Sequence, residues 1–417
     1  MEAAQSTPWS DLQPELLGLV LRHLPSLADR VRLRAVCRPW RSNSMSQPLP
    51  LPFPWLTLPD GTFLSIPANE IHRVPIPDGA CVQGSIDNWL FLMHKSSMDN
   101  HNVCSLMNPF SKATLELPDL VAVWKHQTSY YSHRKPFFYK LVVPSPLDSS
   151  PDSPVAALIM DDGNSHILCI SQPPIATSSL RARSNKDPRL YLSDVVFFNR
   201  KLYGLHGSGK LYIIDLDNDL GISSIECIID ALGDISGIPQ HLSGMVYMSR
   251  EYLVECGGKL LMVIRWFNLM PKPTDDDDVF ENTRTVALQV FEADLCSSPN
   301  RWRSATELGG HALFVGQRSS KSLPARECSG YHEDCIYFMF DYDWPTSSAN
   351  PLRDSGVYNI RNGTIAPLMS GTSAASLHRV GQWRPTWFFP PEAVWSIQSG
   401  FCSSFILAIC YCISLVV

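Results

Sequence analysis

The pattern of apolar and polar positions divides the chain into a short helical part and a much longer part made of strands. Residues 9–41 have helical periodicity and predict two helices. Pro14 suits the first turn of the first helix, and Pro25 ends that helix. A sequence similar to a capping box begins at Ser26 and predicts a second helix, which we expect to continue through Trp40.

The first of these helices is apolar on nearly all sides. Its apolar side chains point around most of its circumference (Leu16, Leu17, Leu19, Val20 and Leu21). A unit of about 40 residues is at the lower limit of independent stability and cannot cover such a helix alone. The helix therefore either packs on the rest of the chain or docks on a partner, and the pattern alone leaves both alternatives open.

A proline-rich segment separates the helices from the strands. Residues 46–58 carry proline at alternate positions, which excludes a helix and suits an extended linker. Beyond this linker, short β-rich runs alternate with turn residues. Three pairs of runs predict β-hairpins: 155–160 with 165–170, 201–206 with 210–215, and 356–360 with 364–368.

Further strands are expected in the runs 89–93, 259–267, 286–295 and 335–342. Loosely similar strand starts recur along this part of the chain, which is too long for one ordinary sandwich. At about 40–50 residues per four-stranded blade, it predicts a β-propeller of six to eight blades.

Composition narrows the classes of function. The 417 residues are 45% hydrophobic, as in a globular protein, and the net charge of −6 excludes a basic nucleic-acid surface over the whole chain. The one basic cluster lies in the helical part, where we interpret it as a solvated helix face rather than a nucleic-acid site. It consists of Arg22, Arg30, Arg32, Arg34, Arg38 and Arg41.

Cysteine usage and the first residues bear on the compartment. The 12 cysteines include no C-x-x-C pair, and the N-terminus does not resemble a signal peptide. We therefore expect free thiols in a reducing compartment, cytoplasmic and/or nuclear.

Motifs for catalysis, metals and cofactors are missing from the sequence. Residues 204–210 resemble a P-loop, but Leu211 stands where Ser or Thr is needed and a strand follows, so a hairpin turn is expected. The acidic run 275–278 does not have the spacing of a calcium loop and is interpreted as a solvated loop. We therefore expect no catalytic residue, no metal site and no cofactor.

The end of the chain is unusual, because residues 393–417 contain no charged residue. Three interpretations compete: a membrane anchor, a buried strand that completes a blade, and an alternative or mispredicted coding end fused to a complete propeller. No basic cluster follows the apolar segment, which weakens the anchor interpretation.

The helical part resembles an F-box. The residues that carry the resemblance are Leu12, Pro14, Glu15, Leu16, Leu24, Asp29, Arg32, Val36, Cys37, Trp40 and Arg41. The strand-rich part resembles the KIB-type propeller that follows the F-box in a large plant family. Its carrying segments are Gly84-Ser85 with Trp89-Leu90, Asn108-Pro109-Phe110-Ser111 with Leu115, Leu117 and Pro118, Leu308 to Gly316, and Pro385 to Phe388 with Pro390.

On either side of the linker at 46–58, the resemblance implies a small all-α F-box at 1–45 and an all-β propeller at 59–391, whereas the atypical tail at 392–417 departs from the family pattern. The resemblance further implies a non-catalytic adaptor: the F-box docks on a Skp1-like subunit of a cullin–RING ubiquitin ligase, and the propeller recruits a target protein for ubiquitination. A partner would also cover the apolar first helix. The expected docking residues are Leu12, Pro14, Leu16, Leu17, Val20, Leu24, Val31 and Trp40, some of which must form the core of the module.

Three other functions compete with this one. The chain could be an interaction scaffold that acts without a ligase, or an adaptor tethered to a membrane by residues 393–417. It could also be a propeller enzyme, which would need His, Asp or Glu side chains converging at the central channel. No short motif names the target or the propeller loops that bind it.

Overall fold

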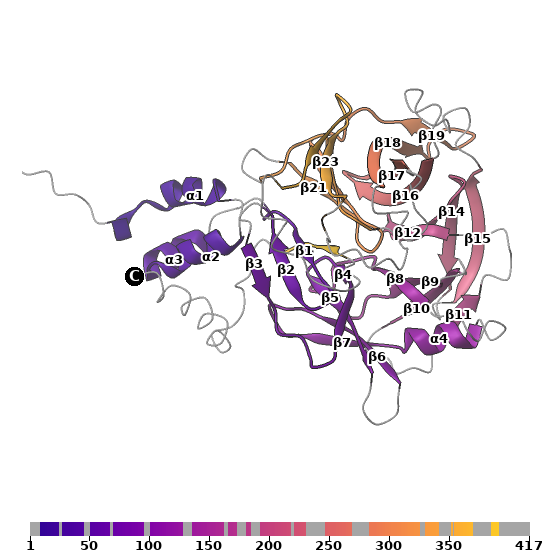
Figure 1. Ribbon diagram of the computed structural model, residues 1–417, viewed down its shortest axis with the longest axis horizontal. Coiled ribbons are helices and arrows are strands. Elements are labelled where there is room, and N and C mark those ends of the chain that lie inside the picture. Colours follow the sequence, from indigo (N-terminus) through magenta and orange to yellow (C-terminus); the bar gives the residue numbers. More distant parts are fainter. Residues whose placement is uncertain are drawn as a thin grey trace, which may run out of the picture.

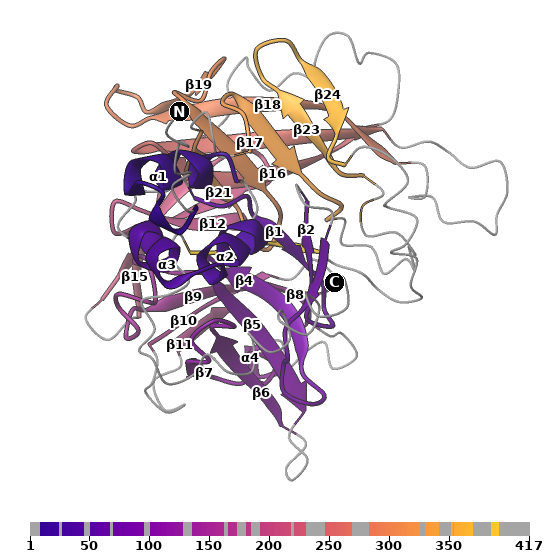
Figure 2. The same ribbon diagram turned by 90° about the vertical axis from the view of Figure 1, so that its left-hand side faces the viewer.

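The computed structural model of the chain describes sixteen stretches, and the apolar tail, the acidic run 275–278 and the side chain of Val31 lie outside them. The described residues are 9–24, 27–45, 51–66, 70–95, 101–127, 136–161, 166–172, 181–184, 192–217, 221–230, 247–268, 283–325, 330–341, 352, 354–369 and 385–391. They form a helical module and a β-propeller, with the helices outside the ring of strands and beside β3 (Figures 1 and 2).

The helical module contains a 3-10 turn and three short helices. These are η1 (Trp9–Asp11), α1 (Pro14–Arg22), α2 (Leu27–Ala35) and α3 (Arg38–Met45). The prediction of a single second helix through Trp40 is wrong, because this segment forms two helices, which are separated at residues 36 and 37. In a continuous helix Pro39 would lack a hydrogen bond and its ring would clash with the carbonyl of Ala35. Pro39 instead occupies the first turn of α3, where its missing N–H costs nothing.

Six sheets surround a central axis as the blades of the propeller (Figure 1). Blade 1 contains β1 (Trp55–Thr57), β2 (Thr62–Ser65), β3 (Glu70–Arg73) and β25 (Thr386–Phe388). Blade 2 contains β4 (Cys81–Ile86), β5 (Trp89–Lys95), β6 (Asn102–Met107) and β7 (Thr114–Leu117). Blade 3 contains β8 (Pro136–Val142), β9 (Val155–Asp161), β10 (His166–Ser171) and β11 (Arg181–Ser184).

The second half of the ring continues in chain order. Blade 4 contains β12 (Leu192–Phe198), β13 (Lys201–His206), β14 (Leu211–Leu216) and β15 (Ile222–Ile229). Blade 5 contains β16 (Tyr247–Cys256), β17 (Lys259–Asn268), β18 (Arg284–Asp294) and β19 (Arg301–Ser304). Blade 6 contains β20 (His311–Val315), β21 (Lys321–Pro324), β22 (Cys335–Phe338), β23 (Gly356–Asn359) and β24 (Thr364–Pro367).

The three expected hairpins are confirmed as the antiparallel pairs β9–β10, β13–β14 and β23–β24. The P-loop-like segment is the turn between β13 and β14, as expected, where Gly209 donates its N–H to the carbonyl of His206 over 2.8 Å. The blade count of six lies within the expected range. Helix α4 (Leu120–Gln127) was not expected, and neither was the parallel pairing of β20 with β22 in blade 6.

Blade 1 closes the ring with strands from both ends of the propeller. The late strand β25 pairs with β1, so that Trp55 lies opposite Phe388. The propeller therefore begins before residue 59, the start expected from the sequence. The alternating prolines end at Pro54, and the backbone N–H groups from Trp55 onward are free to pair in a sheet.

The cores of the blades merge into clusters between neighbouring sheets. Between blades 6 and 1, Phe53 from the linker packs against Phe314 and Tyr337, with ring centroids 5.6 Å and 5.5 Å apart. Between blades 2 and 3, Trp124 of α4 fills the corresponding space.

No helix in the described stretches is long and apolar enough to cross a membrane.

Candidate functional site

Helix α1 has one buried face and one exposed apolar face. Leu17 and Leu21 are fully buried and form the core of the helical module. On the other side, Leu16, Leu19 and Val20 are 47%, 51% and 44% exposed. We call these three residues the α1 apolar face. Their spacing of three and four positions places them together on one side of the helix.

The structure divides the expected docking residues between this face and the core. Leu16 and Val20 belong to the α1 apolar face, whereas Leu17 is inside the module. Four of the expected residues are only partly buried. Leu12, Leu24 and Trp40 pack against Leu17 and Leu21, and Pro14 lies at the start of α1. Leu19 was not among the expected docking residues, although its spacing from Leu16 would have indicated it.

The arginines of the helical module do not all lie on a solvated face, as the sequence had suggested. Arg30 is fully buried and donates from Nε to the carbonyl of Leu24 over 2.7 Å. Arg34 is also buried, and burial lowers the pKa of its guanidinium. Arg32 is exposed and joins the module to blade 1, with its Nη2 atom 2.8 Å from Oε1 of Glu70 on β3.

The second candidate region lies on the propeller axis, where a side chain from a loop of blade 6 crosses the centre of the ring. The loop between β20 and β21 carries Arg318, which is almost fully buried. Its guanidinium donates to the carbonyl of Gln83 in blade 2 and, over 3.3 Å, to that of Phe137 in blade 3. This side chain therefore spans the centre of the ring and ties three blades together.

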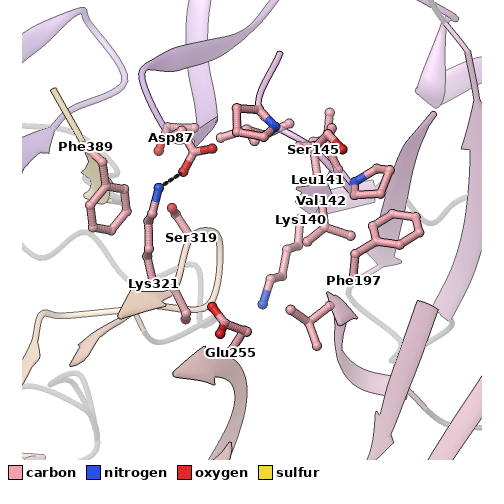
Figure 3. Close-up of a pocket in the computed structure, with 17 residues that line it drawn as sticks. Asp87, Lys140, Leu141, Val142, Ser145, Phe197, Glu255, Ser319, Lys321 and Phe389 are labelled. Atoms are coloured by element: carbon pink, nitrogen blue, oxygen red, sulfur yellow. Dashed lines mark hydrogen bonds and ion pairs between the residues drawn. The ribbon is translucent and has the colours of Figure 1, made fainter. Parts of the chain in front are cut away.

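A pocket opens on the axis beside this loop, and all six blades contribute to it (Figure 3). Its volume is about 220 Å³. Most of its walls come from the ends of the inner strands β4, β8, β12 and β16, with residues that precede β21 and follow β25. We call it the axial pocket. Its charged and aromatic lining residues are Asp87, Lys140, Phe197, Glu255, Lys321 and Phe389.

Lys140 lines this pocket and carries a buried charge. Its ammonium, on a residue that is only 3% exposed, pairs with the buried carboxylate of Asp194 on β12. Asp194 also accepts hydrogen bonds from the backbone N–H groups of Val195 (2.7 Å) and Leu253 (2.8 Å). Burial raises the pKa of Asp194, and the nearby Lys140 opposes that rise. The pair joins blades 3, 4 and 5.

A second hollow, of about 160 Å³, lies beside the axial pocket and shares Asp87, Lys321 and Phe389 with it. Leu51 and Pro52, from the chain that leads out of the helical module, form part of its wall. The second hollow therefore borders the segment that follows the helical module in the chain.

The segments that carried the family resemblance meet around the closure of the ring. Trp387 donates from Nε1 to the carbonyl of Val315 over 2.9 Å, and Ser85 donates its hydroxyl to the carbonyl of Trp387. Asn108 accepts the N–H groups of Phe110 and Ser111, at 2.9 Å and 3.1 Å, and so holds its turn. These residues build the scaffold, and none of them forms a reactive group.

The chemistry available at the axial pocket is that of ion pairs. Lys321 pairs with Asp87, and Lys140 pairs with Asp194. No histidine lines the pocket in the described part of the chain. Within those same residues there is also no group of three metal-ligating side chains. A propeller enzyme would need His, Asp or Glu side chains converging at the channel, and among the described lining residues Asp87 and Glu255 are the two of these types.

Comparison with known proteins decides the family. The KIB1-4 beta-propeller family matches residues 63–359, which is well over half of the chain. The chain belongs to the KIB1-4 beta-propeller family. This match and the relatives described next, which are plant F-box proteins, confirm the expected resemblance to plant F-box proteins that carry a KIB-type propeller.

Relatives of this KIB1-4 propeller protein include two from Arabidopsis thaliana. F-box protein SKIP23 is 22% identical over 392 residues, which are 86% of this chain and 90% of the relative. F-box protein At2g26160 is 23% identical over 350 residues, which are 79% and 95% of the two chains. Among solved structures, the N-terminal domain of Nup159 is similar at a TM-score of 0.29 and 9% identity, covering 78% of this chain and 68% of that one.

Proposed function

We propose that this KIB1-4 propeller protein is a non-catalytic substrate-recognition adaptor of a Skp1–cullin–F-box ubiquitin ligase. The helical module docks on a Skp1-like protein, and the propeller recruits a target protein. The observation that carries the proposal is the α1 apolar face, which stays exposed although Leu17 and Leu21 are fully buried behind it. The similar proteins are themselves called F-box proteins.

The energetics favour docking through this face. Burying apolar surface is worth about 25 cal/mol per Å², from which the cost of association is subtracted. The described residues of the propeller leave the α1 apolar face exposed, which supports docking on a partner. By bringing a target close to a ubiquitin-loaded enzyme, an adaptor raises effective concentration and needs no reactive group of its own.

Reconstitution tests this proposal. The full chain is mixed with a Skp1-like protein and a cullin, and the mixture is separated by size-exclusion chromatography. We expect one complex that contains all three proteins, and we expect Leu16→Asp, or Pro14→Ala with Leu16→Ala, to be absent from it. Retained binding by both variants would contradict the docking model. A complex that contains the Skp1-like protein but no cullin would favour a scaffold that acts without the ligase.

A further inference from the structure

The axial pocket has the size of a site for one side chain. Cofactor and small-molecule clefts usually measure about 300–1,000 Å³, and this pocket is smaller, at about 220 Å³. It opens on the propeller axis, where six separate strands or their adjoining loops supply the walls. A pocket of this kind can receive a projecting side chain of a protein target. The inference that follows rests on the proposed recruitment of a target by the propeller.

Among the described residues around the axial pocket, one carboxylate has no counterion within ion-pair distance. The two ammonium groups already have carboxylate partners, Asp87 for Lys321 and Asp194 for Lys140. Glu255 accepts the N–H of Gly258 through Oε1, at 2.8 Å, and it forms no ion pair with any residue that the structure describes. Glu255 is therefore the lining carboxylate with which a cationic ligand can pair, and its charge would repel an anionic ligand.

The aromatic walls of the axial pocket also favour a cationic ligand, and in particular a guanidinium group. Figure 3 shows Phe197 and Phe389 on opposite sides of the pocket, with Glu255 between them at its lower edge. Phe389 already lies beneath a cation, since Nζ of Lys321 is 5.5 Å from the centre of its ring. Aromatic rings attract guanidinium groups, and a planar guanidinium can pair with a carboxylate through two parallel hydrogen bonds.

We propose that the axial pocket binds an arginine side chain of the target protein. The guanidinium pairs with Glu255, and the hydrocarbon part of the side chain packs against Phe197 and Phe389. Glu255 is suited to this role because one of its oxygens is held by the backbone N–H of Gly258. That bond positions the carboxylate, and the second oxygen together with the remaining lone pair of Oε1 can accept the two N–H groups of a guanidinium.

The position of the pocket fits recruitment. Leu51 and Pro52 line the neighbouring hollow, so a bound target would lie close to the segment that follows the docking helices in the chain.

Saturation-transfer NMR on the full-length protein tests the proposal, with N-acetyl-arginine amide as the probe and N-acetyl-citrulline amide as its uncharged counterpart. We expect the arginine probe to bind at least threefold more tightly than the citrulline probe. Glu255→Gln should remove this preference, since glutamine keeps the acceptor for Gly258 but has no charge. Glu226→Gln is the matched control, because Glu226 is exposed on β15, away from the pocket, and it should leave the preference unchanged.

Three results would overturn the proposal: equal binding of the two probes, an equal effect of the two glutamine variants, or tighter binding of N-acetyl-lysine amide than of the arginine probe. The assay contains no Skp1-like protein, so its failure leaves the docking function intact. Conversely, Leu16→Asp should lose the Skp1-like protein and still bind the arginine probe.

Discussion

Arg265 and Asp354 join blades 5 and 6 through a fully buried ion pair, in which Nη2 lies 2.8 Å from Oδ2. The same guanidinium also contacts Asp341 at 3.0 Å and lies over the rings of Phe267 and Phe338, at 4.8 Å and 4.5 Å. Such a charge is stable in the interior only because each of its hydrogen-bonding groups has a partner. This network therefore fixes how the two blades pack.

Removing the Arg265 charge should be strongly destabilising. In Arg265→Met the carboxylates of Asp341 and Asp354 stay buried without their cation, and the free energy of unfolding should fall by about 3–5 kcal/mol. Lys259→Met is the control, since its pair with Glu292 is largely exposed and should contribute no more than about 1 kcal/mol. Urea unfolding measures both, and equal losses in the two variants would contradict the role given to the buried network.

Replacing Lys140 should make stability depend on pH. Burial raises the pKa of Asp194, and Lys140 opposes this effect, so Lys140→Met should raise that pKa further. When a carboxyl has a higher pKa in the folded protein than its unfolded value of about 3.9, the folded state binds more protons between the two values. Stability is then lost as the pH rises through the folded pKa.

We therefore expect Lys140→Met to lower the free energy of unfolding more at pH 8 than at pH 5. Chemical denaturation at both pH values measures it. In the double variant Lys140→Met with Asp194→Asn no carboxyl remains to titrate, and the difference from the wild type should change much less with pH. A loss in Lys140→Met that is the same at pH 5 and pH 8 would show that Asp194 does not govern it.

Cysteine reactivity should follow burial. Burial raises the pKa of Cys104 and of Cys169 to about 12, and both thiols lie in the cluster between blades 2 and 3. At pH 8 only about one in 10⁴ of these thiols is ionised, and the thiolate is the reactive form. Iodoacetamide should therefore modify exposed Cys296 in the native protein and leave Cys104 and Cys169 unmodified until it unfolds. Peptide mass spectrometry after timed quenching measures this order.

The strands could be predicted because their signals are local. The hairpins β9–β10, β13–β14 and β23–β24 each consist of two apolar runs on either side of a short turn, so neighbouring residues carry all the information. Helix α4 was missed because its sequence, LVAVWKHQ, contains no helical repeat long enough to stand out among strands. The parallel pair β20–β22 forms because β21, which lies between the two strands in the chain, pairs with the other edge of β20, and local patterns do not reveal this arrangement.

The candidate sites were predictable to different degrees. The apolar circumference of α1 was visible in the sequence, but only the packing of α1 against α3 separates buried Leu17 from exposed Leu16. The axial pocket left no sequence signal at all. Lys140 and Glu255 lie in different blades, more than a hundred positions apart, and only closure of the ring brings them to one pocket.

The affinity of the full chain for a Skp1-like protein tests the central claim most directly. Isothermal titration calorimetry should show tight binding by the wild type and at least a 100-fold loss for Leu16→Asp with Val20→Asp, which places two charges on the α1 apolar face. Ile225→Asp is the matched control, because Ile225 is an exposed apolar residue on β15 of blade 4, and its affinity should stay within about threefold of the wild type. Unchanged affinity in the double variant, or no binding by the wild type, would contradict the account.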